Sequence, residues 1–100
     1  MLIGRNAKKL SSLSVELASR NNSVEVITLT VDFVDELDYE RIESQLAKLD
    51  IGIFMNFVGV SYPLPQLLHQ LDEKFDGLSW EHINVNVMSA TNLTRLILPG

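Results

Sequence analysis

Short apolar segments alternate with segments of helical periodicity along this 100-residue chain. Residues 24–31 (VEVITLTV) are rich in β-branched side chains, which favours a strand. Residues 51–58 (IGIFMNFV) are almost entirely apolar, as is typical of a strand buried on both faces of a parallel sheet. Residues 1–3 resemble the end of an earlier strand. Because strands that alternate with helices pair in parallel, an α/β fold of order β-α-β-α-β-α is expected.

Three helices are predicted between and after these strands, and each follows a residue that suits an N-cap: Asn6, Asp35 and Ser79. The first two carry one apolar stripe each, formed by Leu10, Leu13 and Leu17 and by Tyr39, Ile42, Leu46 and Leu49. The third, over residues 80–98, is apolar most of the way round, which predicts burial on more than one side. Residues 59–77 contain Pro63 and Pro65 and are expected to be irregular, with a helical turn at residues 67–71.

Composition excludes several classes of function. The net charge of −5 makes nucleic acid an unfavourable partner. The absence of cysteine excludes disulfides and thiolate metal sites. The two histidines, His69 and His82, show no repeated ligand spacing, so no metal site is expected. No apolar run approaches the roughly 20 residues that span a bilayer, so no membrane segment is expected in this chain.

Charge is distributed unevenly, and the basic start of the chain is a candidate phosphate contact. Residues 1–20 hold four bases and one acid, whereas residues 21–50 hold eight acids and two bases. Arg5 follows the first strand, and its planar guanidinium suits a phosphate group. A solvated loop arginine is the alternative.

Polar residues and glycine also follow the second and third predicted strands. Asp32 and Phe33 end the first β-branched segment, where ligands of open α/β sheets bind, although Asp32 also suits a helix cap. The third predicted strand ends in residues 56–59 (NFVG), where glycine permits close approach of the backbone to a ligand. Asn86 is a polar residue in an apolar helix, which indicates either a functional role or a structural hydrogen bond to backbone.

In combination, residues 3–6 with Lys9, residues 31–33, residues 56–59 and residues 83–87 (INVNV) resemble the middle of a short-chain dehydrogenase/reductase. The nearest subgroup is that of 17β-hydroxysteroid dehydrogenase type 12 and very-long-chain 3-oxoacyl-CoA reductase, with its dehydrogenase-like relatives. The resemblance covers the whole chain. It implies a partial Rossmann-type, doubly wound parallel sheet with strands 2, 3 and 4, without strand 1 and the C-terminal half. Residues 1–100 are therefore expected to be the central part of one NAD(P)-binding domain.

The resemblance also implies roles for individual residues. Arg5 corresponds to the residue that faces the adenosine 2′-phosphate, which favours NADP(H) over NAD. The residues expected to bind the cofactor are Arg5, Asp32, Phe33, Asn56, Val58 and Gly59, and Asn86 is expected to support the catalytic proton relay through a water on its backbone. Phe57 departs from the family pattern, which has a second asparagine that ties neighbouring strands together.

The function implied is NADPH-dependent reduction of a lipid ketone, either a 3-oxoacyl-CoA of fatty acid elongation or a steroid 17-ketone, at the endoplasmic reticulum. A homodimer through the helix of residues 80–98 is expected. The chain has no Tyr-x-x-x-Lys, because Glu43 follows Tyr39 and Gln66 follows Tyr62 at that spacing, and no glycine-rich turn. By itself it is therefore expected to be inactive, marginally stable and prone to aggregation, since strand 4 would lack its neighbour, strand 1.

Two alternatives remain open. A non-catalytic relative would keep the fold as a cofactor- or partner-binding module, and Phe57 favours it. A flavodoxin-like regulator would use Asp32 for a metal or phosphoryl group, but it leaves Asn56, Gly59 and Asn86 without a role.

Overall fold

A computed structural model describes residues 1–35, 39–70 and 78–99. The chain divides into two compact units, Met1–Phe33 and Val34–Gly100. None of the helices in the described ranges combines the length and the apolar character needed to cross a bilayer.

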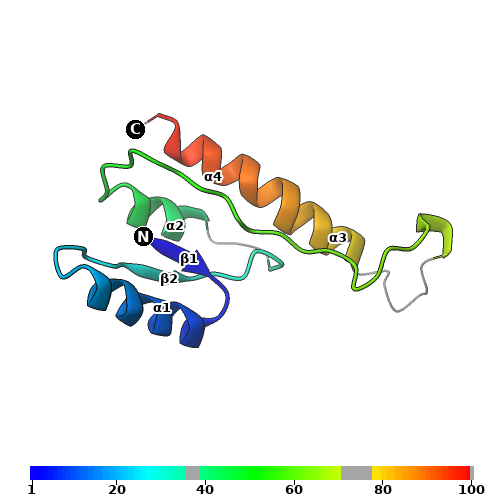
Figure 1. Ribbon diagram of the computed structural model, residues 1–100. Coiled ribbons are helices and arrows are strands. Elements are labelled where there is room, and N and C mark those ends of the chain that lie inside the picture. The colour runs from blue at the N-terminus through cyan, green and yellow to red at the C-terminus, as the bar shows by residue number, and fades with distance from the viewer. Residues whose placement is uncertain (36–38, 71–77, 100) are drawn as a thin grey trace. The chain divides into compact units, whose positions relative to one another are not determined.

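The first unit is a parallel β-α-β element. It consists of β1 (Leu2–Gly4), α1 (Ala7–Arg20) and β2 (Thr28–Thr30), and α1 runs alongside the two strands (Figure 1). Leu2 pairs with Thr28 and Gly4 with Thr30. The Leu2 N–H also donates to Ile27 O at 2.8 Å, and the Val31 N–H donates to Gly4 O at 2.9 Å, so the ladder extends one residue beyond β2 at each end. The predicted pairing of the first two strands is confirmed.

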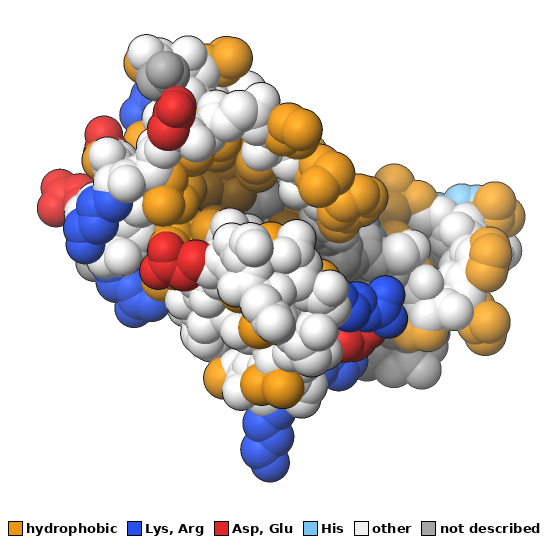
Figure 2. Space-filling view, turned by 60° about the vertical axis from the view of Figure 1, so that its left-hand side comes forward, with side chains coloured by type: hydrophobic (Ala, Val, Ile, Leu, Met, Phe, Trp, Pro, Cys, Tyr) orange, Lys and Arg blue, Asp and Glu red, His pale blue; other side chains and the backbone are white. Residues whose placement is uncertain are grey.

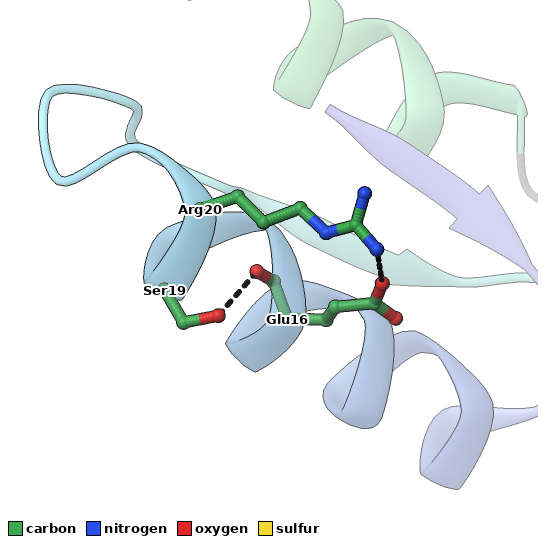
Figure 3. A network of polar contacts seen from close by, with 3 residues as sticks. All are labelled: Glu16, Ser19 and Arg20. Carbon is green, nitrogen blue, oxygen red and sulfur yellow. Dashed lines mark hydrogen bonds and ion pairs between the residues drawn. The ribbon is translucent and has the colours of Figure 1, made fainter.

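Asparagine residues cap both ends of α1, Asn6 through its side chain and Asn21 through its backbone N–H. Asn6 Oδ1 accepts the Lys9 N–H at 3.0 Å, which confirms the predicted N-cap. At the other end, the Asn21 N–H donates to Leu17 O at 3.1 Å, and Asn21 Oδ1 accepts the Ser23 N–H at 3.0 Å in the predicted turn. Arg20 and Glu16 form an ion pair of 2.6 Å beside the Ser19 hydroxyl (Figure 3). Both partners are exposed, so this pair contributes only about 0.3–0.5 kcal/mol.

Replacing Asn6 by alanine is expected to lower the stability of the first unit by about 1 kcal/mol, because the Lys9 N–H loses its acceptor. Helical circular dichroism without denaturant measures the resulting loss of helix. Asn22→Ala is the matched control, since Asn22 lies in the exposed turn after α1. An unchanged helical signal for Asn6→Ala would contradict the capping role.

The second strand is shorter than predicted. The sequence pattern predicts a strand over residues 24–31, but β2 covers Thr28–Thr30 and Val24 is exposed. The neighbouring strand limits its length, because β1 has three residues and a ladder forms only where both strands are present.

The second unit is mainly helical in its described residues. It contains α2 (Tyr39–Leu46), a 3₁₀ turn (Leu68–Gln70), and a long helix made of α3 (Leu78–His82), a π-helical segment (Ile83–Met88) and α4 (Ser89–Ile97). The predicted apolar stripe is confirmed for Ile42 and Leu46, which are buried, and for Tyr39, which is half-buried. Leu49 is half-buried but lies beyond the end of α2. Asp35 was expected to cap this helix, but residues 36–38 between Asp35 and α2 lie outside the described part. Of the helical turn predicted at residues 67–71, the structure describes residues 67–70 and forms the 3₁₀ turn over Leu68–Gln70.

The long helix is buried along one stripe, formed by Val85, Ser89 and Leu93 at four-residue spacing. The prediction of burial on more than one side is wrong for the single chain. Four of its other apolar side chains are exposed, namely Trp80, Ile83, Val87 and Met88, whereas Leu96 and Ile97 are half-buried. The helix begins at Leu78, so the predicted cap at Ser79 is also wrong, and Ser79 lies in the first turn.

The prediction of a buried strand over residues 51–58 is wrong. No strand forms there, Ile53 is 81% exposed and Phe57 is 88% exposed. Figure 2 shows hydrophobic side chains on the molecular surface. The physical reason is the missing partner: among the described residues the sheet consists of β1 and β2, and an apolar segment without a paired neighbour forms no ladder.

Candidate functional site

Three cations gather at the start of α1. Arg5 lies between β1 and the capping residue Asn6, and Lys8 and Lys9 occupy the first helical turn, which carries no acid. Within the described residues, the Arg5, Lys8 and Lys9 side chains make no ion pair. Cations at a helix N-terminus oppose the helix dipole, so an anion bound here would relieve their mutual repulsion.

Asp32 and Phe33 lie at the same edge of the sheet as Arg5. Gly4 is paired with Thr30, so Arg5 and Asp32 both follow the carboxyl ends of adjacent parallel strands. Asp32 is half-buried and Phe33 is 4% exposed. The first unit therefore places a guanidinium and a carboxylate at the edge where ligands of parallel sheets bind.

The predicted site residues Asn56, Val58 and Gly59 follow one another in the second unit, and a side-chain contact joins the first two. Asn56 Oδ1 accepts the Val58 N–H at 3.2 Å, so the Asn56 amide stabilises its own turn. Val58 is half-buried and Gly59 is exposed. A Cβ atom added at Gly59 would lie 3.5 Å from Asn86 Oδ1, which is an ordinary contact distance.

The Asn86 side chain binds the backbone of the residue after Gly59. Its Oδ1 accepts the Val60 N–H at 2.8 Å, and its Nδ2 donates to Val60 O at 2.9 Å. One amide therefore occupies both backbone groups of Val60, as a neighbouring strand would. The Asn86 side chain therefore makes the structural hydrogen bonds to backbone that were one of its two predicted roles. The other role, in the proton relay, would use the Asn86 backbone and stays a prediction.

Asn84 is a second amide in the same π-helical segment. Its Nδ2 donates to Val34 O at 3.4 Å, and its backbone oxygen accepts the Ser89 N–H. Residues 84 and 86 point in different directions around the helix, so their amides bind two separate backbone segments. π-Helical turns of this kind occur frequently at functional sites.

Tyr62 and His82 form a further contact of the same loop and helix. Their rings stack with centroids 4.5 Å apart and an interplanar angle of 30°. The sequence indicated no role for either residue. The spacing could have indicated this contact. His82 and Asn86 are four residues apart, on one face of a helix, and Val60 and Tyr62 are two residues apart, on one side of an extended segment.

The structure therefore groups the predicted site residues into two sets. Arg5, Asp32 and Phe33 belong to the first unit, and Asn56, Val58, Gly59 and Asn86 belong to the second. Their convergence on one nucleotide remains a prediction. In the described ranges, no group of three His, Asp or Glu side chains is placed to hold a metal ion.

Comparison with known proteins identifies the relatives. The chain is 38% identical over 100 residues to very-long-chain 3-oxoacyl-CoA reductase of Homo sapiens, and 39% identical over 100 residues to that of Bos taurus. It is 39% identical over 99 residues to very-long-chain 3-oxoacyl-CoA reductase-B of Danio rerio. The chain is homologous to the short-chain dehydrogenases/reductases. The predicted resemblance to this family is confirmed.

The similarity to these short-chain dehydrogenases/reductases covers all or nearly all of the chain but only 31% of the length of each relative. No protein-family model and no solved structure matches the sequence. The parallel β-α-β element is consistent with a partial Rossmann-like unit.

Proposed function

We propose that this chain is part of an NADPH-dependent reductase that acts on a lipid ketone, with a 3-oxoacyl-CoA as substrate. The similarity over the whole chain to reductases named for that substrate carries the proposal. A steroid 17-ketone is the second substrate class, whereas the reductases compared above are named for the 3-oxoacyl-CoA.

Binding of NADP(H) is supported by the chemistry of the first unit. Arg5 and Lys9, which form no ion pair within the described ranges, offer cations for a 2′-phosphate. Asp32 follows the adjacent strand, where its carboxylate can accept a hydrogen bond from the adenine amino group. The Phe33 backbone would lie beside the adenine ring. In the second unit, Gly59 permits backbone approach to the ribose, and the turn of Asn56 and Val58 sets its position.

Proton transfer is the part proposed for Asn86. Its side chain is held by Val60, so the helix backbone around it has a defined position. A water on the Asn86 backbone would carry protons toward a lysine outside these residues. The bound cofactor supplies the hydride.

A chimera tests the proposed function. The 100 matched residues of the human reductase are replaced by this chain, so that the relative supplies the flanking segments. We expect NADPH-dependent reduction of a long-chain 3-oxoacyl-CoA, followed by the loss of NADPH absorbance. A folded chimera that binds NADPH without turning it over would instead favour the non-catalytic alternative.

Phe57 is the observation behind that alternative, because an exposed ring stands where the family has a strand-tying amide. The endoplasmic reticulum and a homodimer through the exposed apolar side of the long helix are proposed on the same family basis.

A further inference from the structure

Two contacts join one loop to one helix in the second unit. The Asn86 amide binds both backbone groups of Val60, at 2.8 and 2.9 Å, and the His82 ring stacks on Tyr62 at 4.5 Å. Figure 1 shows the extended segment before the 3₁₀ turn running alongside α3 and α4, as these contacts require.

The spacing of the four residues makes the contacts act together. His82 and Asn86 are four residues apart, with His82 at the start of the π-helical segment and Asn86 inside it. Val60 and Tyr62 are two residues apart, about 6.6 Å in an extended chain. The loop and the helix therefore meet at two points, and a second point of contact restrains the direction of the loop more than the Val60 contact alone.

We propose that His82 is a positioning residue, which with Asn86 fixes the Gly59–Tyr62 loop on the helix. Neither ring is fully buried, so the stack is not part of a hydrophobic core. Its effect is to hold the backbone beside Gly59. The consequence for ligands rests on the proposed function, in which that backbone approaches the cofactor ribose.

Hydrogen exchange of the full chain tests the contact directly. Mass spectrometry at nanomolar concentration, below the range in which the chain is expected to associate, compares a peptide covering residues 58–62 with a reference peptide from α4. Asn86→Ala removes the acceptor of the Val60 N–H and defines complete loss of protection. His82→Ala is expected to speed exchange of the loop peptide about two- to tenfold relative to the reference, as the loss of one aromatic pair predicts.

Two variants separate positioning from general stability. His82→Phe keeps a stacking ring and is expected to exchange like the unmodified chain. His69→Ala removes the other histidine, which is exposed, and is expected to have no effect. Equal acceleration of loop and reference in His82→Ala, or His82→Phe behaving like His82→Ala, would overturn the proposal, and so would an unchanged loop peptide.

Kinetics of the chimera test the consequence. His82→Ala is expected to raise the KM for NADPH about two- to tenfold while kcat stays within about twofold, and His82→Phe is expected to restore the KM. A parallel fall in kcat would indicate a merely structural role. A chimera without any activity would count against the proposed function, and the exchange experiment would still decide the role of His82.

Discussion

Replacing Arg5 by alanine in the chimera is expected to raise the KM for NADPH by about ten- to hundredfold while the KM for NADH changes little. The two cofactors differ only in the 2′-phosphate. Hydrogen bonds between charged groups contribute about 1.5–3 kcal/mol, and every 1.4 kcal/mol is a factor of ten. Arg5 forms no ion pair among the described residues, so no acid of that part of the chain competes for its guanidinium.

The control for Arg5 is Arg20→Ala. Arg20 lies at the other end of α1, is exposed and is already paired with Glu16 at 2.6 Å, so its loss is expected to leave both KM values unchanged (Figure 3). Initial rates with each cofactor at saturating ketone measure the effect. Equal weakening of NADPH and NADH by Arg5→Ala would contradict recognition of the 2′-phosphate.

Local sequence patterns predicted the helices well, because helix periodicity and capping depend on neighbours three and four residues away. The Asn6 cap and the buried pair Ile42 and Leu46 are examples. Ser79 shows the limit of this reasoning. It was predicted to be the N-cap, but the helix begins at Leu78, so Ser79 lies inside the first turn. Helix boundaries depend on packing as well as on local propensity.

Strands were predicted less well, because a ladder needs a partner that can be far away in sequence. Residues 28–30 pair with β1, whereas the more apolar residues 51–58 form no strand. The apolar composition of residues 51–58 predicted burial, but a segment is buried only where other elements cover it. The expectation that this strand would lack its neighbour, strand 1, predicted the outcome better than the hydrophobicity of the segment.

The candidate site shows the same division between local and non-local information. Asn86 was selected from the sequence because a polar residue in an apolar helix needs a partner, but Val60 was not identified as that partner. Tyr62 and His82 are 20 residues apart, and their stack depends on how the loop crosses the helix. Such contacts become visible only when the tertiary structure is known.

The exposed apolar segment of residues 53–57 is expected to cause self-association of the isolated chain. Four apolar side chains of this segment face solvent: Ile53, Phe54, Met55 and Phe57. Apolar segments without a paired neighbour associate with other copies, and no charged residue interrupts this one. We therefore expect the isolated chain to associate at micromolar concentration and to lack a sharp cooperative melt.

Substituting both Ile53→Lys and Phe57→Lys is expected to raise the concentration at which the chain associates by more than about tenfold. Burying each of these side chains contributes about 1.5–3 kcal/mol, so losing two exceeds the 1.4 kcal/mol that corresponds to a factor of ten. At 81% and 88% exposure, neither substitution disturbs a core. Val15→Lys is the matched control, because Val15 is 69% exposed on α1, away from the segment in sequence. Light scattering and sedimentation velocity measure the effect. If the control reduces association as much as the double variant, general charge rather than this segment governs it, and a sharp monomeric melt of the unmodified chain would contradict the expectation altogether.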